Sequence, residues 1–229
     1  MPTHLRTITT ARLSASALVL VALGLTLTDT SGLVPQRAID LMGYYTLQAN
    51  FLALAVWVSL AFASTRTVSP KRALALEYAR AFATANLLMV AAIYWSTIAP
   101  LGLEDGLGLV IVMVISHVIT PLFASIDYFV IGTRARLPLK GWWWFFAIPT
   151  TWIATAIARA YAGGWIPYDY LDPARGLRAI VGTVSWHGVL MAGLTIITLR
   201  VRSLRVVPHL AAITPAPEPA SLDTDRAVA

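Results

Sequence analysis

The sequence predicts an all-α membrane protein, a bundle of six transmembrane helices whose N and C termini both lie on the cytoplasmic side. Of its 229 residues, 58% are hydrophobic and 12% are charged, whereas about a quarter of the residues in a soluble domain are charged. Six apolar runs have about the 20 residues that a helix needs to cross the hydrocarbon core of a bilayer. Basic residues gather in alternate loops between these runs, as the positive-inside rule describes for membrane proteins.

The predicted spans are joined by short polar loops, several with Pro or Gly, so we expect one transmembrane domain over residues 1–207. The first run has basic flanks, as a secretory signal does, but its exit at 26–30 lacks a small-x-small cleavage site. We therefore expect it to be retained as a span. The tail at 208–229 is polar and rich in Pro, and we expect it to be disordered. The six spans are expected at about 13–31, 40–63, 79–98, 107–131, 142–161 and 178–200.

The charged residues outside the spans divide between two sides. This division predicts cytoplasmic termini and an even number of spans. The net charge of +6 is therefore explained by membrane topology and by attraction to anionic lipids, rather than by binding to nucleic acid. The excess of Arg over Lys, with abundant Ala, fits a GC-rich coding sequence and a bacterial inner membrane. The basic side carries Arg6, Arg12, Arg66, Lys71, Arg72, Arg80, Arg134, Arg136, Lys140, Arg200, Arg202 and Arg205. The opposite side carries Asp40, Glu104, Asp105, Asp169 and Asp172, with Arg37, Arg159, Arg175 and Arg178.

A few strongly polar residues fall inside the predicted spans. Each costs on the order of 2–3 kcal/mol or more at the bilayer centre, so such residues normally face the bundle interior or a wet cavity. They are Thr46, Gln48 and Asn50 in the second span, Asn86 in the third, His117, Thr120 and Asp127 in the fourth, Arg159 in the fifth and His187 in the sixth.

The spacing of these residues predicts two polar helix faces. Thr46 and Asn50 are four residues apart and lie on one side of the second span. His117, Thr120, Ala124 and Asp127 share a face of the fourth span. Pro121 lacks a backbone N–H and frees the carbonyl of His117, so we expect a bend there.

Depth along each span follows from the helical rise of about 1.5 Å per residue. On the boundaries above, His117 lies about 15 Å and His187 about 13–14 Å below the outer edge, so the two are level. Thr46 lies about 9 Å down if its span begins at Asp40 and almost at the surface if it begins at Tyr44, so it is level with the histidines only if the second span is long.

The polar residues match the needs of acyl transfer. A hydroxyl becomes a good nucleophile when an adjacent base takes its proton, so Thr46 and His117 form a minimal pair. Amide groups stabilise a developing oxyanion, which makes Gln48 and Asn50 candidates, and Asn86 is a candidate to orient the imidazole. The alternative is structural: Thr46 donates to a backbone carbonyl and His117 bridges two helices.

Structural roles are expected for the charged residues near the span ends. Asp127 lies near the cytoplasmic boundary, where Arg80, Arg134 and Arg136 are its expected partners. Arg159 is expected to pair with Asp169 or Asp172 and to hold the fifth loop. The residues Trp142, Trp143 and Trp144 follow Lys140 and resemble an interfacial anchor. Two roles remain open for His187. It forms a hydrogen bond that helps pack two helices, or it is a second polar group in the cavity that contains Thr46 and His117.

Three segments, in order, resemble one family, the androgen-induced membrane hydrolases and their bacterial six-span relatives. Tyr-Tyr-Thr-Leu-Gln-Ala-Asn-Phe at 44–51 resembles the family's aromatic-Thr-x-Gln-x-Asn stretch. His117, Pro121 and Asp127 reproduce a His-x3-Pro-x5-Asp pattern. Gly-Trp-Ile-Pro-Tyr at 164–168 and Leu-Asp-Pro at 171–173, preceded by Arg159, resemble the fifth loop of the bacterial branch.

The resemblance implies an intramembrane hydrolase. Animal members cleave fatty-acid esters of hydroxy fatty acids with a Thr nucleophile and a His. By motif, these roles fall on Thr46 and His117, with a lipid or fatty-acyl ester as the expected substrate and no cofactor.

Two other functions fit the same residues. His117 and His187 are level on different spans, as the axial ligands of a bis-histidine haem protein are. A lipid-binding or carrier protein would use the same cavity without chemistry, with Thr46 as a hydrogen-bonding group only. A metal site is not expected, because no His, Asp or Glu cluster has ligand spacing on one helix.

Overall fold

The structure is a computed structural model that describes residues 2–28, 40, 43–99, 107–132, 137–201, 205–206, 210 and 212–213. The described residues form an all-α fold, and five of its helices are long and apolar enough to cross a membrane. The chain is therefore a multi-pass membrane protein. The helices are α1 (Thr3–Leu27), α3 (Tyr45–Ala63), α4 (Pro70–Ile93), η1 (Tyr94–Ile98), α5 (Leu107–Val114), η3 (Ile115–Ile119), α6 (Thr120–Ser125), η4 (Ile126–Val130), η5 (Trp142–Phe146), α7 (Ala147–Tyr161), η6 (Asp169–Leu171), η7 (Pro173–Arg175) and α8 (Leu177–Arg200).

The fourth and sixth spans agree closely with the predicted boundaries, and the first three do not. The α1 helix begins ten residues earlier than predicted, and α4 begins nine residues earlier, with η1 completing one 29-residue span. The start of the second span was also wrong, because α3 begins at Tyr45 rather than at Asp40. Apolar content marks the part of a helix that lies in lipid, whereas these helices continue through polar residues at the basic end.

The predicted fifth span is divided into two helical segments. The 3-10 helix η5 is followed by the 15-residue helix α7, which is shorter than the five candidate spans. Pro149 explains the division, since its ring occupies the place where a continuous α-helix would need the carbonyl of Phe145, four residues earlier. At about 2.0 Å per residue for η5 and 1.5 Å for α7, the two segments extend over about 32 Å, close to the hydrocarbon thickness of about 30 Å.

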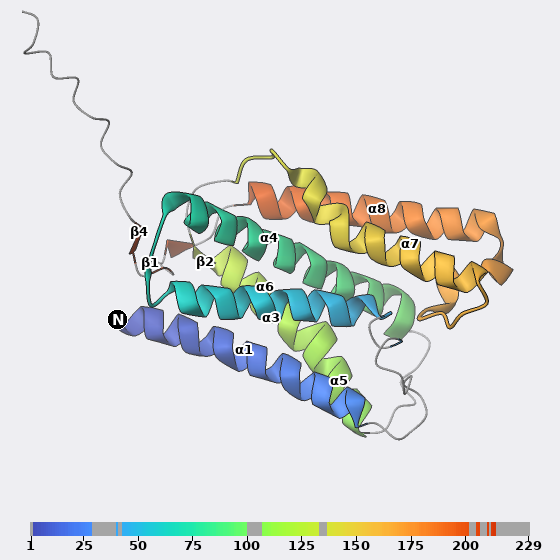
Figure 1. The fold of residues 1–229 in the computed structure, drawn as a ribbon, viewed down its shortest axis with the longest axis horizontal. Helices are drawn as coiled ribbons and strands as arrows, with labels where there is room; N and C mark the ends of the chain where they lie inside the picture. The colour runs from blue at the N-terminus through green and yellow to red at the C-terminus, as the bar shows by residue number, and fades with distance from the viewer. Residues whose placement is uncertain are drawn as a thin grey trace, which may run out of the picture.

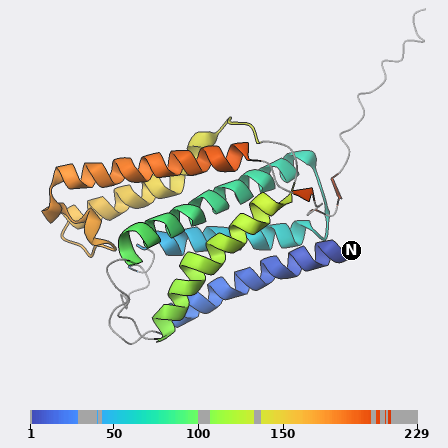
Figure 2. The same ribbon diagram turned by 180° about the vertical axis from the view of Figure 1, so that it is seen from behind.

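Helices α3 and α4 run side by side through the middle of the bundle, with α1 on one side and α7 and α8 on the other (Figure 1). The continuous helix from α5 to η4 crosses the bundle obliquely on the far side (Figure 2). Pairs of small residues four apart lie at the centre, Ala49 and Ala53 on α3 and Ala81 and Ala85 on α4, all fully buried. Small side chains let two helix backbones approach closely in a membrane, where dispersion contacts hold helices together.

Short contacts join the chain segments at one end of the bundle. Thr9 and Ser64 share a hydrogen bond of 2.7 Å between the first helix and the end of α3. Strand β1 (Thr67–Val68) pairs with β4 (Ala212–Ile213), and β2 (Ile131–Gly132) pairs with β3 (Arg205–Val206). The N-terminal helix start, the 64–69 loop, the segment after η4 and the chain after α8 therefore meet at the same end (Figure 1). These are the four segments that the sequence assigns to the basic side.

The prediction of disorder from residue 208 is wrong for part of the tail. Ala212 and Ile213 form strand β4 beside the 67–68 strand, and Leu210 packs on a small apolar cluster of Ala63, Val68 and Ala73. Residues 214–229 lie outside the described residues, as do Arg37, Glu104, Asp105, Arg134, Arg136 and Arg202 from the loop charges.

Two arginines share one aspartate inside the bundle near the basic end. Arg12 on α1 is fully buried and contacts the Asp127 carboxylate at 2.9 Å. Arg80 on α4 contacts the other oxygen of Asp127 at 3.2 Å and also pairs with Glu77 at 3.0 Å. The expected pairing of Asp127 with Arg80 is confirmed, and Arg12, which the sequence assigned to a loop, is a second partner. These pairs join α1, α4 and η4.

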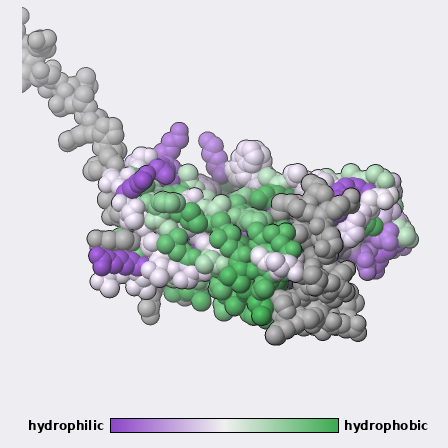
Figure 3. All heavy atoms as spheres, turned by 60° about the horizontal axis from the view of Figure 1, so that its bottom comes forward, coloured by the Kyte–Doolittle hydropathy of each residue, from purple (hydrophilic) through white to green (hydrophobic). Residues whose placement is uncertain are grey.

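The surface has the distribution expected of a membrane protein. Hydrophobic residues cover the middle of the face in Figure 3, and hydrophilic residues gather towards its two ends. Large apolar side chains on several helices are exposed, among them Leu20, Phe62 and Val189, each more than half exposed. Such a surface is suited to contact with lipid chains.

Candidate functional site

Thr46 and His117 lie in hydrogen-bonding contact. The Thr46 Oγ1 is 3.2 Å from the Nε2 of His117. Thr46 is the second residue of α3, and His117 lies within the π-helical segment η3. The predicted need for a longer second span was wrong, because the oblique course of the 107–130 helix brings His117 to the start of α3 (Figure 2).

The other ring nitrogen of His117 determines which way this hydrogen bond runs. Its Nδ1 is 3.2 Å from the carbonyl oxygen of Met113. A carbonyl only accepts hydrogen bonds, so Nδ1 carries the proton in this contact. In the neutral imidazole Nε2 is then an acceptor, and Thr46 donates its hydroxyl proton to it. This is the arrangement that a general base requires.

Pro121 shapes the helix around His117. The segment η3 is a π-helix that ends at Ile119, and Pro121 is the second residue of α6. The predicted release of the His117 carbonyl is confirmed, because this oxygen accepts a hydrogen bond from the indole Nε1 of Trp95 at 3.3 Å. π-Helical turns are frequent at functional sites, where they displace a side chain from regular helical spacing.

Tyr94 and Trp95 contact the histidine from η1, and sequence reasoning missed both. The Tyr94 ring stacks on the His117 imidazole with centroids 3.9 Å apart and planes inclined by 22°. Trp95 packs against Tyr94 edge-on. The consecutive Tyr and Trp at the end of the third span were the available signal, but such aromatics are equally typical of a membrane interface.

Asn50 links the two polar faces. Its Nδ2 donates to the Thr46 carbonyl at 2.9 Å, and its Oδ1 accepts from Thr120 at 2.7 Å. The predicted proximity of Thr46 and Asn50 on α3 is confirmed, and Thr120 reaches Asn50 from α6. This bond to the Thr46 carbonyl uses one of the two N–H donors of the Asn50 amide, and the oxyanion role of Asn50 stays a prediction.

Asn86 does not orient the imidazole. Its Oδ1 accepts a hydrogen bond from the Tyr45 hydroxyl at 2.6 Å, and its Nδ2 donates to the Phe82 carbonyl at 2.8 Å. The residue is fully buried and ties α3 to α4. Gln48 is half-buried in the first turns of α3, and its oxyanion role stays a prediction.

Arg159 has a different partner from the two that were predicted. It pairs with the buried carboxylate of Asp40, and not with Asp169 or Asp172. Asp172 instead caps η7 by accepting a hydrogen bond from the Ala174 backbone N–H at 2.8 Å. The Arg159 guanidinium also lies 5.8 Å from the Trp165 ring centroid, so it still holds the fifth loop, through an aromatic side chain.

Close packing at Gly43 explains why α3 begins where it does. A Cβ atom at this position would lie 2.8 Å from the Asp40 carbonyl oxygen and 3.0 Å from Trp165. The Gly43 carbonyl accepts a hydrogen bond of 2.7 Å from the indole of Trp152. The loop before Tyr45 is thus held against the fifth loop and α7.

An aromatic cluster covers the start of α3 next to Thr46. Tyr44 packs edge-on against Trp165 and Tyr168, with centroids 5.2 and 5.8 Å away, and Tyr168 stacks on Tyr170 at 5.1 Å. Burial raises the pKa of Tyr168 to about 12, and nearby polar groups of Thr46 and Tyr45 limit the rise. Tyr168 therefore stays a neutral hydroxyl group beside Thr46 across the physiological pH range.

His187 lies beyond this cluster. Its Nδ1 contacts the Thr183 carbonyl of its own helix at 2.6 Å, and its ring lies 5.5 Å from that of Tyr170. Its Nε2 is buried and has no hydrogen-bond partner among the described residues. Neither interpretation is established, since the ring contact joins His187 to Tyr170 of the fifth loop, and among the described residues no hydrogen bond joins it to Thr46 or His117.

The residues around His117 do not fit a bis-histidine haem site. An axial histidine needs one free ring nitrogen directed at the iron. In His117 one nitrogen faces the Met113 carbonyl and the other faces Thr46, while Tyr94 covers a face of the ring. Among the described residues no group of three or more His, Cys, Asp or Glu side chains has the arrangement of a metal site.

Comparisons of the chain with protein-family models, curated proteins and solved structures find no match.

Proposed function

We propose that the protein is an intramembrane lipid ester hydrolase in which Thr46 is the nucleophile and His117 is the general base. The observation that carries the proposal is the 3.2 Å contact between Thr46 Oγ1 and His117 Nε2, together with the Met113 carbonyl that keeps the proton on Nδ1. A hydroxyl group that donates to a neutral imidazole is the resting state of a nucleophile and base pair.

The reaction proceeds in two halves. Thr46 Oγ1 attacks the ester carbonyl carbon while Nε2 of His117 takes the hydroxyl proton, and the same nitrogen then protonates the departing alkoxide. An acyl-threonine remains. Water attacks its carbonyl with His117 again as the base, the fatty acid leaves, and Thr46 regains its proton.

Tyr168 and Gln48 are the candidates to stabilise the oxyanion in this proposal. An oxyanion requires a preorganised donor directed at the oxygen where charge develops. The raised pKa of Tyr168 keeps its hydroxyl group protonated, and Tyr168 lies close enough to Thr46 to be affected by its polar groups. Gln48 lies two residues from Thr46 near the start of α3.

The location of the pair favours a substrate that arrives from the bilayer. Thr46 and His117 are on membrane-spanning helices and are both half-buried. The family resemblance of the 44–51, 117–127 and 164–173 segments points to fatty-acid esters of hydroxy fatty acids as the substrate class. The proposal includes six spans, with η5 and α7 as the fifth, and an inner-membrane location in a bacterium with both termini cytoplasmic.

The proposal is tested by separate substitutions Thr46→Ala and His117→Ala in the purified protein, assayed with a fatty-acid ester of a hydroxy fatty acid. Each is expected to lower kcat at least about 10³-fold, because members of a catalytic unit are individually essential. Thr46→Ser keeps a hydroxyl group and is expected to retain measurable turnover. A fluorophosphonate probe is expected to label the native protein and Thr46→Ser, but not Thr46→Ala.

Thr155→Ala is the matched control, since Thr155 is an exposed helical threonine bonded to a carbonyl of its own helix. Full activity in purified Thr46→Ala or His117→Ala would exclude the proposed roles. Lipid that copurifies equally with native protein and Thr46→Ala, without hydrolysis or probe labelling in either, would identify a lipid-binding or carrier protein instead.

A further inference from the structure

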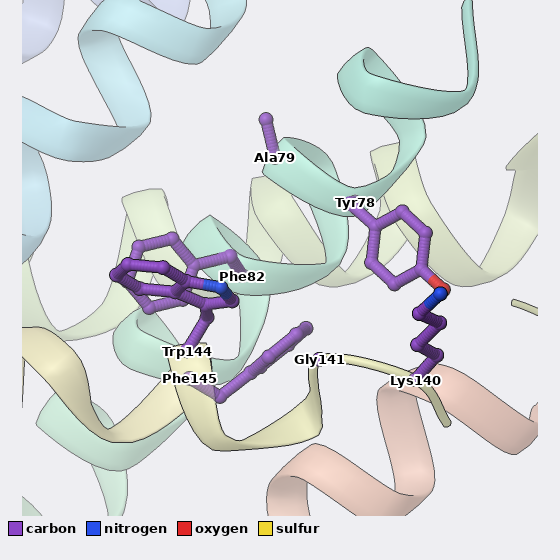
Figure 4. A pocket seen from close by; sticks show the side chains of 7 residues that line it. All are labelled: Tyr78, Ala79, Phe82, Lys140, Gly141, Trp144 and Phe145. Atoms are coloured by element: carbon purple, nitrogen blue, oxygen red, sulfur yellow. The ribbon is translucent and has the colours of Figure 1, made fainter. Parts of the chain in front are cut away.

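A groove lies between α4 and η5, near the basic end of the bundle. Its volume is about 390 Å³, within the range of about 300–1,000 Å³ of small-molecule sites. Figure 4 shows side chains from the two elements on either side of it. None of them is a candidate catalytic residue. The groove is lined by Tyr78, Ala79, Phe82, Lys140, Gly141, Trp144 and Phe145, and we call it the α4–η5 groove.

The body of the α4–η5 groove is aromatic. Phe145 is buried and packs edge-on against Phe82, with centroids 5.5 Å apart. Trp144 is 60% exposed and stacks on Trp143 at 4.2 Å. The exposed indoles of 142–144 continue the apolar surface beyond the groove. A long alkyl chain is suited to such walls, because they offer mainly apolar contact.

One end of the α4–η5 groove is polar and positively charged. The Tyr78 hydroxyl donates to the Pro138 carbonyl at 2.6 Å, which fixes the loop before Lys140 to α4. Gly141 has a φ of 82°, a left-handed conformation that favours glycine and turns the chain between Lys140 and Trp142. Lys140 is exposed, and no carboxylate pairs with it among the described residues. An unpaired cation thus stands at the mouth of an aromatic groove.

The position of the α4–η5 groove matches the headgroup level of the cytoplasmic leaflet. Lys140 belongs to the loop that follows β2, at the end where the basic segments meet. Trp residues next to a Lys mark the membrane interface. Basic pockets between helices at this level bind lipids with anionic headgroups.

We propose that the α4–η5 groove binds an anionic phospholipid of the cytoplasmic leaflet, with the headgroup phosphate at Lys140 and an acyl chain along Tyr78, Phe82 and Trp144. Charge complementarity selects the headgroup, and the aromatic walls hold the chain. The lipid also bridges α4 and η5, so its binding stabilises the docking of the divided fifth helical segment on the bundle.

The test is native mass spectrometry of the full chain in a mild detergent, titrated separately with phosphatidylglycerol and phosphatidylcholine. The native protein is expected to bind phosphatidylglycerol more tightly. Lys140→Glu is expected to weaken that binding at least about fivefold, the factor that corresponds to about 1 kcal/mol per basic residue at an anionic surface. It is expected to weaken phosphatidylcholine binding less, because the choline cation already offsets the charge of that phosphate. Ala79→Trp fills the groove and is expected to weaken the binding of both lipids.

Lys71→Glu is the matched control, because Lys71 is the other lysine of the chain and is exposed at the start of α4, outside the groove lining. Equal effects of Lys71→Glu and Lys140→Glu, or equal binding of the two lipids by the native protein, would overturn the proposal. So would a dimer that Ala79→Trp dissociates, since a second copy would then occupy the groove. Thermal unfolding of each variant distinguishes a loss of lipid binding from a loss of folding. None of these measurements depends on ester hydrolysis.

Discussion

At the scale of single residues, the chemistry of the candidate site depends on the hydrogen-bond partner of each polar group. The sequence predicted which residues turn inwards, because a polar side chain in a span is costly unless it finds a partner. It did not predict the Met113 carbonyl at Nδ1 of His117, which determines the tautomer. Nor did it predict that Asn50 and Asn86 use their amide groups within the bundle.

Tyr168 provides a prediction at this scale. Its pKa is raised by burial from 10.0 to about 12. Below pH 10 both folded and unfolded states keep the proton, so this group contributes no pH dependence. Between about pH 10 and 12 the unfolded chain releases the proton while the folded protein holds it, and the free energy of unfolding falls as pH rises. The fall from this residue is roughly 2–3 kcal/mol, at about 1.4 kcal/mol per pKa unit.

The measurement is the midpoint of thermal unfolding in detergent from about pH 9 to about pH 11.5. Tyr168→Phe has no ionisable group at this position and is expected to show a shallower decline than the native protein. Tyr161→Phe is the control, because Tyr161 is exposed at the end of α7. Identical declines in native protein and Tyr168→Phe would contradict the prediction.

At the scale of elements, the longest apolar runs were located well and the interruptions within them were not. The 107–131 span is observed as one helical course from Leu107 to Val130, but it contains two π-helical segments. Pro121 signals the first of these, because a proline cannot donate to the carbonyl four residues back. No residue type marks the second, η4, which ends where Arg80 donates to the Ile131 carbonyl at 2.8 Å.

The buried charge cluster of Arg12, Arg80 and Asp127 gives a prediction about the packing of α1, α4 and η4. Asp127→Asn removes the carboxylate that Arg12 and Arg80 share. Removing one partner of a buried ion pair lowers the free energy of unfolding by about 3–5 kcal/mol, since the remaining charges stay buried without compensation. We expect a large fall in the unfolding temperature and loss of the monodisperse fraction on size-exclusion chromatography.

Arg72→Ala is the control for this substitution, because Arg72 is exposed in the first turn of α4. A surface change of this kind is usually within about 0.5 kcal/mol of neutral. Equal unfolding temperatures for Asp127→Asn and Arg72→Ala would show that the cluster does not hold α1, α4 and η4 together.

At the scale of the whole molecule, the number of membrane crossings is open to direct measurement. The chain contains no cysteine, so single cysteines report on one position each. Leu139 and Asp169 are exposed on the two sides of the η5 and α7 segment. If this segment crosses the bilayer, as its length of about 32 Å allows, Leu139→Cys and Asp169→Cys react with a membrane-impermeant maleimide from opposite sides.

Labelling in intact spheroplasts and in inverted vesicles distinguishes the two sides. Arg66→Cys in the 64–69 loop is expected to behave as Leu139→Cys does, because both loops lie at the basic end. Labelling of Leu139→Cys and Asp169→Cys from the same side would leave five crossings and place α7 at the surface of the membrane.

The sequence by itself determined the all-α membrane class, five of the spans, the basic end and several of the buried polar residues, among them Asn50, Thr120 and Asp127. Hydrophobicity, charge and helical periodicity are local properties, so they can be read without knowing which helices touch. Only the tertiary structure decided the partners: Asp40 for Arg159, Arg12 for Asp127 and Tyr45 for Asn86. Those pairings depend on how far each helix extends and at what angle it crosses its neighbours. The same physical reason places His117 against Thr46, since the oblique 107–130 helix, and not the length of α3, brings the two side chains level.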